Sequence, residues 1–452
     1  MVKNAYQLLE NSCDPTARRA REILVDLVDA AIGSADPSLA IKRCLKLHGD
    51  DLSVSGHKFD LSRIGKVVVV GGGKASGAMA HALWEIMGEK ISGGVICVPQ
   101  AAPSKDTRIN FIEAGHPIPT ESGVAGTALM MDLLRDLGSD DLAICLISGG
   151  GSALMPLPSE GLTLKDLGET THLLLRSGAT IQELNAVRKH LSAVKGGQMA
   201  QVASPAKIVA LIISDVVGDR LDTIASGPTV QDHTTFGDAL SVLKKYELLD
   251  RAPPQVISHL KEGMGRNIPE TPKSGLGNAF NRIIASNADA LRATGEEGRT
   301  RGLNVHIVTN SMEGEAREVG ANLSHIIGEV LGGGKPIRKP ALLLSGGETT
   351  VTVKGRGKGG RNQELALSAS LGISDVGVAI ASFSTDGIDG PTEAAGAIAD
   401  GFTLLRARRK GLDPLAYLED NDSYHFFSEL GDLLVTGPTG TNVMDITALV
   451  IL

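Results

Sequence analysis

Several loops of this chain place glycines beside charged side chains, a combination that suits an anion carrying several oxygens. The densest is Gly355–Glu364, in which three cations and an acid fall within ten residues. Glycine costs conformational entropy on folding, so its density indicates that the backbone comes close to something. Cations beside backbone amides are typical of phosphate sites. The alternative is a basic hairpin tip in water, and the other loops must decide between the two.

A second loop, Val70–Gly77, leads from a strand-like run into a helical one. Amides and the helix dipole attract anions at such a junction, and Lys74 could neutralise a phosphate or a carboxylate there. The dinucleotide-binding fingerprint is incomplete, because Ser76 stands at its third glycine position and the next strand ends in Val98-Pro99-Gln100 without an acid. The Walker A pattern is absent as well. A tight turn with a solvated lysine is the alternative.

Ser148–Ser152 has the same form but no cation of its own, so it would hold oxygens while charge comes from elsewhere. Ser345–Glu348 repeats the strand-then-Ser-Gly-Gly pattern in the second half of the chain. Either this similarity arises by chance, or each domain contributes one glycine loop and one acidic loop to a shared cleft.

Acidic loops accompany both glycine loops. Asp215 and Asp219 follow one apolar run, and Asp386 and Asp389 follow another. Carboxylates at the ends of strands suit Mg²⁺, which prefers one or two carboxylates plus phosphate oxygens. Turns use aspartate just as readily, for side-chain-to-backbone hydrogen bonds. These four aspartates are therefore the candidate metal ligands.

A helical segment, Glu183–His190, adds Asn185, Arg188 and Lys189 on one face. That face either contacts an anion or is simply solvated, and His190, which has no partner visible in the sequence, is interpreted as structural. No Ser/His/Asp set or His-rich metal spacing stands out. Amide-rich loops, fixed cations and carboxylates are the parts that phosphoryl transfer needs, because its catalysis rests on positioning and charge neutralisation.

The elements that must position these loops alternate along the chain. Short, wholly apolar runs lie at 66–70, 94–98, 142–147 and 208–214, with helical segments between them. Continuous apolar strands separated by helices indicate a parallel sheet covered on both faces. We therefore predict a doubly wound α/β domain, preceded by a helix that Asp14 caps and Pro15 begins.

A second alternating region follows a stretch rich in Pro, Gly and polar residues. Its predicted helices cover 279–293 and 315–331, and its predicted strands cover 304–309, 341–344, 349–353 and 377–383. The predicted domains are residues 1–240 and 241–452. The placement of the final strand, 445–452, is left open, and it could return to the first domain.

Bulk properties exclude several function classes. The 452 residues exceed what one hydrophobic core usually supports, and apolar residues make up 42% of the chain. The net charge of −8 argues against nucleic acid as a partner. Four cysteines without ligand spacing, and no apolar run long enough to cross a membrane, predict a soluble cytoplasmic protein. The oligomeric state stays open, with a homodimer as one option.

These motifs together resemble class II glycerate kinases. The resemblance rests on the loops at 71–76, 148–154, 214–219 and 226–229 and the helix at 185–192, and on a C-terminal module, MOFRL (about 335–452), with motifs at 345–349, 359–364 and 385–390. It spans nearly the whole chain in the expected order. It implies a Rossmann-like first domain, a smaller α/β second domain and an active site in the cleft between them.

The resemblance further implies phosphorylation of D-glycerate by ATP and a divalent metal such as Mg²⁺, giving 2-phosphoglycerate. Lys74 and Arg361 match the residues regarded as central in the family, and we expect them to neutralise the phosphoryl group and the glycerate carboxylate in an order left open. Asp215 or Asp386 would hold Mg²⁺ or act as base. The other predicted binding residues are Gly72, Gly73, Ser76, Ser148, Gly149, Gly150, Gly151, Ser152, Asn185, Arg188, Lys189, Ser226, Gly227, Thr229, Ser345, Gly346, Gly347, Glu348, Asn362 and Glu364.

Two other functions compete with this one. Members of the family are often labelled hydroxypyruvate reductases, which would use NAD(P)H. The incomplete dinucleotide fingerprint and the lack of a visible His–carboxylate pair count against that reading. The second rival is a sensor that binds a phosphorylated metabolite without converting it. A sensor gives less reason for so many carboxylates.

Overall fold

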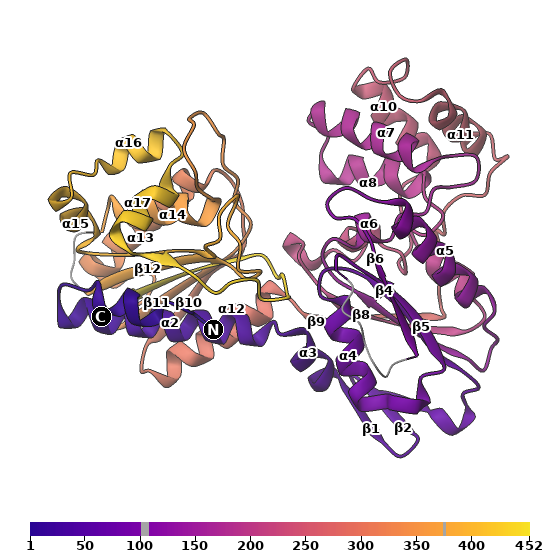
Figure 1. Ribbon diagram of the computed structural model, residues 1–452, viewed down its shortest axis with the longest axis horizontal. Coiled ribbons are helices and arrows are strands. Elements are labelled where there is room, and N and C mark those ends of the chain that lie inside the picture. The colour runs from indigo at the N-terminus through magenta and orange to yellow at the C-terminus, as the bar shows by residue number, and fades with distance from the viewer. Residues whose placement is uncertain (101–107, 374–376) are drawn as a thin grey trace. The chain divides into compact units, whose positions relative to one another are not determined.

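The computed structural model describes residues 1–100, 108–373 and 377–452 (Figure 1). The chain forms two compact units. Residues 37–284 make up one, here called the central unit, and residues 1–36 together with 285–452 make up the other, the terminal unit. This division differs from the predicted one at residue 240, because the predicted second domain loses 241–284 to the central unit and gains the N-terminal helices.

The central unit is built on a six-stranded sheet with the order β6-β5-β4-β7-β8-β9. The strands are β4 (Val67–Gly72), β5 (Gly93–Val98), β6 (Ile109–Glu113), β7 (Leu142–Ile147), β8 (Lys207–Ile213) and β9 (Ala279–Ala285). The pairings from β6 through β8 are parallel. Every residue of β4 and β7 is buried, as expected of strands covered on both faces. The predicted Rossmann-like sheet is confirmed.

The order of these strands locates the site. Numbered from β4, it is that of a dinucleotide-binding fold, and the order reverses between β4 and β7. Ligands of such sheets bind beyond the carboxyl ends of the strands at this reversal. The loops that follow β4 and β7 are Gly71–Ser76 and Ser148–Ser152, so the predicted glycine loops lie where the fold places ligands.

Helices cover the sheet and form a cluster at one end of the central unit (Figure 1). The helices are α3 (Pro37–Cys44), α4 (Ser76–Met87), α5 (Glu121–Arg135), α6 (Gly151–Leu154), α7 (Leu164–Arg176), α8 (Ile181–His190), α9 (Gln198–Ala203), α10 (Phe236–Lys245) and α11 (Pro254–Met264). Threonines begin α7, α8 and α10 with capping boxes, an N-terminal signature readable in the sequence. A small antiparallel sheet, β1 (Leu45–His48), β2 (Asp51–Val54) and β3 (His57–Asp60), precedes β4.

The terminal unit holds a second six-stranded sheet, with the order β10-β11-β15-β12-β13-β14. The strands are β10 (Asn304–Met312), β11 (Ala341–Gly347), β12 (Val378–Ser384), β13 (Gly396–Asp400), β14 (Leu433–Leu434) and β15 (Asp445–Ile451). Only the β10–β11 pairing is parallel among these described strands. β15 lies between β11 and β12 and is buried along its whole length. The final strand therefore completes this sheet and does not return to the first domain.

The helices of the terminal unit lie on both faces of its sheet. Figure 1 shows α2 (Pro15–Ser34) and α12 (Asn287–Thr300) on one face, and α13 (Ala316–Gly333) and α14 (Arg361–Ser370) on the other. The remaining helices are α1 (Ala5–Glu10), α15 (Thr403–Arg409), α16 (Pro414–Glu419) and α17 (Ser423–Leu430). As predicted, the Asp14 side chain caps α2, accepting from the amides of Thr16 and Ala17. No helix among the described residues is long and apolar enough to cross a bilayer.

A buried ion network attaches the N-terminal helix to the terminal unit. The Arg21 side chain is fully buried, with Nε 2.6 Å from Asp400 and Nη1 2.7 Å from Asp432. Nη1 also donates to the carbonyl oxygen of Leu8 at 2.8 Å. A charge buried this deeply is tolerated only when it is paired and hydrogen-bonded. The partners of Arg21 therefore explain why residues 1–36 join the C-terminal half of the chain.

Two predicted elements are wrong. The helix predicted over 279–293 is strand β9 followed by α12, because the Ser286 side chain caps α12 and accepts from the amide of Asp289. The strand predicted over 349–353 does not form. Thr350 makes one isolated bridge with Glu315, whose carboxylate accepts from the amide of Thr352 at 2.9 Å. A side chain has taken the place of a neighbouring strand there.

Candidate active site

The two glycine loops of the central unit pack directly against each other. The amide of Lys74 donates to the carbonyl oxygen of Gly149 at 2.8 Å, and the amide of Ala75 donates to Ser148 Oγ at 2.9 Å. The Ser76 hydroxyl donates to the carbonyl oxygen of Leu146 at 3.0 Å. Adjacent strands thus bring together two segments that lie far apart in the sequence.

This contact accounts for the glycines of the first loop. A Cβ on Gly73, whose φ is +152°, would lie 2.1 Å from Ser148 Oγ. The amides of residues 73–76 all donate to protein acceptors. The prediction that Gly72, Gly73 and Ser76 hold an anion with their amides is therefore corrected: the backbone comes close to the second loop. Lys74 remains, with an exposed side chain.

The second loop is different, because the amides of Gly149 and Gly150 have no hydrogen-bond partner among the described residues. A Cβ on Gly149 would lie 2.1 Å from Asp215 Oδ2, and one on Gly150 would lie 2.8 Å from His116 Cδ2. The loop thus has a carboxylate on one side and an imidazole on the other. Desolvation and the nearby Lys74 lower the pKa of His116, which favours its neutral form. Sequence reasoning gave no signal for His116.

Three predicted residues from separate segments form one hydrogen-bonded chain. Ser226 Oγ donates to Asn185 Oδ1 at 3.0 Å and lies 2.8 Å from Ser152 Oγ. Ser226 and Ala225 have φ values of 60° and 50°, which are left-handed and strained for residues other than glycine. Strain of about 1–3 kcal/mol per residue persists where the surrounding structure enforces it, and it is concentrated at functional sites.

Two cations lie near these hydrogen-bonded side chains, and neither has an acidic partner among the described residues. Arg188 on α8 is half-buried, and burial lowers its pKa. Lys195 is buried, and its Nζ donates to the carbonyl oxygens of Ser152 at 2.9 Å and Met155 at 3.3 Å. Burial, with a contribution from Arg188, lowers the pKa of Lys195 to about 7. Lys195 was not predicted, although it precedes two glycines, Gly196 and Gly197, just as Lys358 precedes Gly359 and Gly360.

Other predicted residues of the central unit have partners within the fold. Lys189 Nζ lies 3.3 Å from Asp232 and 3.8 Å from Asp222, so its charge is offset. The Thr229 hydroxyl donates to Asn281 on β9 at 2.5 Å, and the amide of Gly227 donates to the carbonyl oxygen of Ile224. His190 Nε2 lies 2.8 Å from Glu270, so a His–carboxylate pair that the sequence did not reveal is present, and the structural interpretation of His190 stays a prediction.

In the terminal unit, Arg361 begins α14 and is held by acids. Its Nε donates to Asp445 Oδ2 at 2.5 Å and its Nη2 to Oδ1 at 3.0 Å, and Glu348 accepts from Nη1. Burial raises the pKa of Asp445 to about 7, and the nearby Asp389 adds to this effect against the opposing influence of Arg361. Asp445 was not predicted, because it lies 84 positions from Arg361 in the sequence.

In the glycine-rich segment before Arg361, the amides of residues 354–358 are engaged by the protein. The amides of Lys354 and Gly355 donate to Asn421 Oδ1 at 2.8 and 3.0 Å. Those of Arg356 and Lys358 donate to the carboxylates of Asp420 and Asp422, each at 2.9 Å. These five amides are therefore closed to an anion, whereas those of Gly359 and Gly360 have no hydrogen-bond partner among the described residues, so the anion loop stays a prediction for that end of the segment.

The other predictions in the terminal unit also meet structural partners. Ser345, Gly346 and Gly347 lie within β11, not in a loop after it. Glu364 is buried between Arg317 and Asn421, and Asn362 Oδ1 accepts from the Ser382 hydroxyl at 2.7 Å. Asp386 accepts from the Ser384 hydroxyl and the amide of Ile388, as in a turn.

Known proteins match both units. Residues 23–261 match the family described as a domain of unknown function (DUF4147), and residues 341–445 match the MOFRL family. A glycerate 2-kinase of Pyrococcus horikoshii is 45% identical over 95% of this chain and 97% of its own length. A D-glycerate 2-kinase of Thermotoga maritima is 42% identical over 94% and 97%. This chain belongs to the glycerate 2-kinase family.

Solved structures of the glycerate kinase family share the fold. A crystal structure of a Pyrococcus horikoshii protein has a TM-score of 0.86 at 44% identity, covering 95% of this chain and 98% of that one. The crystal structure of a Thermotoga maritima glycerate kinase has a TM-score of 0.85 at 40% identity, covering 95% and 99%. Another relative, from Agrobacterium vitis, is named a putative hydroxypyruvate reductase and is 44% identical over 86% of this chain and all of its own length.

The family resemblance implies a metal ion, and the carboxylates differ in how well they would hold one. Among the described residues, no three His, Cys, Asp or Glu side chains gather into a metal site. Asp389 does not fit, because it accepts from the amides of Asn362 and Gln363 at 3.1 and 2.9 Å. Asp219 ends a short 3₁₀ turn with a φ of 54°. Asp215, beside the amide-bearing Gly149, suits a metal shared with phosphate oxygens.

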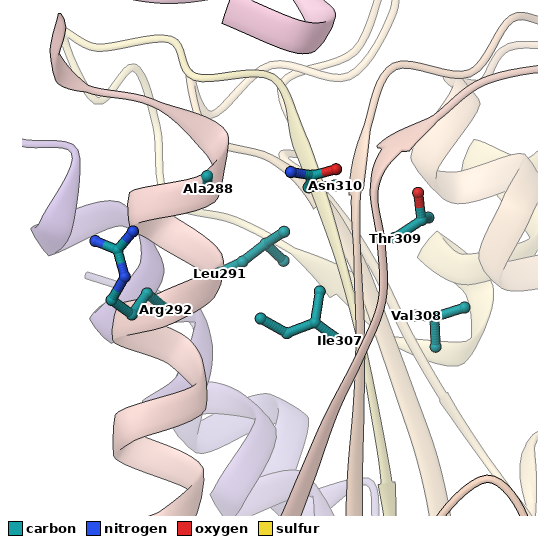
Figure 2. Close-up of a pocket in the computed structure, with 7 residues that line it drawn as sticks. All are labelled: Ala288, Leu291, Arg292, Ile307, Val308, Thr309 and Asn310. Carbon is teal, nitrogen blue, oxygen red and sulfur yellow. The ribbon is translucent and has the colours of Figure 1, made fainter.

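A cavity in the terminal unit borders the predicted residues of β11, because its lining residue Thr309 pairs with Ser345 and its lining residue Leu291 lies 2.9 Å from a Cβ built on Gly346. It measures about 390 Å³ and is lined by α12 and the edge strand β10. Figure 2 shows Leu291 and Ile307 facing it, with Asn310 at its rim. None of the residues that line it was predicted to carry chemistry, so the loops at the β4–β7 reversal remain the candidate site.

Proposed function

We propose that this protein transfers the terminal phosphoryl group of ATP to the 2-hydroxyl of D-glycerate, giving 2-phosphoglycerate and ADP with a divalent metal ion. One observation carries the proposal. At the reversal point of the central sheet, the amides of Gly149 and Gly150 have no partner in the described part of the chain, and Lys74 lies beside them. Relatives named glycerate 2-kinase that align over nearly the whole chain supply the substrate.

The residues of the central unit divide the work by charge. Lys74 and the amides of Gly149 and Gly150 face the phosphoryl oxygens, on which negative charge is concentrated during transfer. Asp215 lies on the other side of Gly149 and orients the attacking hydroxyl or accepts its proton. We place Asp215 rather than Asp386 in this role, because Asp215 lies beside Gly149 at the reversal point of the central sheet.

Asp215 would also be the protein ligand of a magnesium ion. When bound, such an ion supplies charge neutralisation on the nucleotide phosphates. The amides and Lys74 would then need to hold only the oxygens that the ion leaves uncompensated.

Arg361 stays in the proposal as a second catalytic cation. Its guanidinium is fixed by Asp445 and Glu348 and keeps 28% of its side chain exposed. Asp445 and Glu348 use three of its N–H groups, and a guanidinium has five, so two remain for an anion. The kinetics of the Arg361→Lys variant, which keeps the charge and loses the planar fork, test this role.

The structure supports the kinase over a nicotinamide-dependent reductase. In a dinucleotide fold, the acid that binds the ribose ends the strand next to the first one. Here that strand is β5, and it ends in Val98 with Pro99 and Gln100 following. The amides of the first glycine loop, which would hold a pyrophosphate, are engaged by the protein.

The deciding experiment incubates the protein with D-glycerate, ATP and Mg²⁺ and identifies the product by phosphorus NMR. A parallel sample receives hydroxypyruvate and NADH, and its NADH absorbance is followed. We expect a 2-phosphoglycerate resonance and no loss of NADH. Consumption of NADH without a phosphorylated product would replace the kinase by the reductase. A bound phosphorylated metabolite without turnover would favour the sensor.

A further inference from the structure

Arg188 and Lys195 form a positively charged patch, and neither has an ion pair with an acid among the residues that the structure describes. Burial lowers the pKa of both groups, and no carboxylate raises either one. Lys189, the next residue on the same helix, has Asp232 as a partner at 3.3 Å. A buried cation without a counter-ion is costly, so this pair is kept for a ligand that carries negative charge.

Lys195 holds the end of the amide-bearing loop. The carbonyl groups in the last turn of a helix have no partner within that helix. At the short helix α6, the Lys195 ammonium serves as the hydrogen-bond donor for them. It donates to the carbonyl oxygens of Ser152 and Met155. The side chain thereby fixes Ser152, whose hydroxyl meets Ser226.

The groups beside this patch are neutral and suited to hydroxyls. Ser226 donates to Asn185 Oδ1, so the amide group of Asn185 points its hydrogens elsewhere. Asn185 and Arg188 are one turn apart on α8 and share a face. A planar cation one helical turn from an amide donor, which a serine hydroxyl holds in place, matches a small acid that carries a hydroxyl on the neighbouring carbon.

We propose that Arg188 and Lys195 form the subsite for the carboxylate of the 2-hydroxy acid substrate. Arg188 makes the direct contact, and Lys195 is a positioning residue that holds the Ser152 turn and adds its charge. This inference rests on the proposed kinase function. It assigns the carboxylate end of the substrate to Arg188 and Lys195, whereas Lys74 faces the phosphoryl group at the other end. A guanidinium pairs with a carboxylate through two parallel hydrogen bonds, whereas the mobile ammonium of Lys74 suits a phosphoryl group in transit.

The first test compares D-glycerate with its neutral amide, D-glyceramide, in the Arg188→Met variant. We expect KM for D-glycerate to rise about 10–100-fold, as the loss of a charged hydrogen bond predicts, while KM for ATP stays unchanged. The preference of the wild type for D-glycerate over D-glyceramide should shrink by the same factor. Arg176→Met, an exposed arginine at the end of α7, is the matched control and should change neither constant.

The outcomes separate this proposal from the kinase function itself. If the wild type phosphorylates D-glycerate but Arg188→Met raises KM for ATP instead, the patch binds nucleotide phosphates and the proposal is wrong. If the wild type phosphorylates nothing, the proposed function fails first. Binding of D-glycerate without nucleotide, measured by calorimetry, then still reports on the patch by comparison with Arg188→Met.

A second test uses the proton on Lys195. A carboxylate that binds nearby favours the charged ammonium, so binding above about pH 7 should take up a proton. Calorimetry in buffers of different ionisation enthalpy measures this uptake. It should vanish in both Lys195→Met and Lys195→Arg, while only Lys195→Arg keeps most of the affinity.

Other charged groups near the loop provide the check. Arg188 faces Lys195 from α8, and His116 and Lys74 lie at the Gly150 end. Uptake that persists in Lys195→Met would belong to His116 and would remove Lys195 from the subsite. Unchanged affinity in Lys195→Met, in a variant that melts at the wild-type temperature, would do the same.

Discussion

Two glycine-rich segments of this molecule look alike in sequence and differ in use. In the part of the central unit that the structure describes, the amides of Gly149 and Gly150 have no protein partner, and Lys74, Arg188 and Lys195 form no ion pair with an acid. In the terminal unit, the amides of residues 354–358 bind an acidic turn, and Arg361 is tied to Asp445. The second segment is the richer in glycine and cations. Density of these residues therefore does not show that a loop is open to a ligand.

The difference lies in residues far along the chain. In the terminal segment, the amides of residues 354–358 donate to the turn at 420–422, more than sixty positions away. The separation is 64 for the Arg356 and Lys358 amides. The central loop has Asp215 on one side only. We expect substitutions in the terminal unit to act mainly on stability, and those in the central loop to act mainly on turnover.

The largest effect should come from the buried ion network of the terminal unit. Arg21→Met leaves Asp400 and Asp432 buried, with Arg406 as the cation that remains near them. Breaking a buried pair in this way costs about 3–5 kcal/mol. Urea unfolding should show this loss, and the neighbouring Arg19→Met, an exposed residue, should show almost none. An equal loss in both variants would mean that the network adds nothing.

The next largest effect should be on turnover. Lys74→Ala removes a cation facing the phosphoryl group, so we expect kcat to fall about 10²–10³-fold with an unchanged melting temperature. Lys358→Ala is the counterpart in the terminal segment, where the ammonium lies 3.5 Å from Glu393 on the surface. It should keep full activity. Similar kinetics for the two variants would abolish the distinction between the loops.

A matched pair of glycines sharpens the comparison. Alanine at Gly149 would put a Cβ 2.1 Å from the Asp215 carboxylate, and alanine at Gly357 would put one 2.3 Å from Asp422 Cβ. Gly149→Ala should lower kcat about 10–100-fold by displacing Asp215. Gly357→Ala should cost about 1–3 kcal/mol of stability and leave kcat per folded molecule intact. Kinetics and unfolding should be measured on both variants. A loss of kcat in Gly357→Ala, or a loss of stability alone in Gly149→Ala, would contradict the comparison.

Over a single pH unit, the smallest effect concerns Asp445 in the terminal unit. Because burial raises the pKa of Asp445 to about 7, above the ~3.9 of an unfolded aspartate, the folded state binds an extra proton between these values. The stability that this group contributes is present below the lower value and is lost as pH rises to the upper one. Asp445→Asn should therefore gain on the wild type by up to about 1.4 kcal/mol per pH unit in this window. A stability difference that does not vary with pH would show that Arg361 keeps Asp445 ionised.

Much of the fold could be predicted because local signals agree with it. The apolar runs of β4, β5, β7 and β8 are continuous, as buried parallel strands require, and Asp14 before Pro15 marks a helix start. β9 was missed, because its residues are mostly half-buried and its alanines suit a helix as well. The predicted boundary failed for a related reason. Arg21 meets its partners 379 and 411 positions away, which no local pattern reveals.

The site could be predicted only as far as single loops. Lys74, Ser152, Asn185, Arg188 and Ser226 follow from loops and helix faces, and the structure brings these loops together. Whether an amide or a charge is already taken depends on tertiary partners, so Lys189, Glu364 and Asp389 looked available in the sequence and are engaged in the structure. Lys195 and Asp445 were missed because their importance comes from burial.

The position of β15 has a consequence for how the protein is made. This strand occupies the middle of the terminal sheet and is synthesised after every other strand of that sheet. The central unit is continuous in sequence, so it can fold while the ribosome is still adding the remainder. The terminal unit cannot complete its sheet until β15 has been synthesised, although its first helices are made at the start of translation. A chain released before Asp445 would have neither the central strand nor the partner of Arg361, so premature termination should yield a target for proteases instead of a slow enzyme.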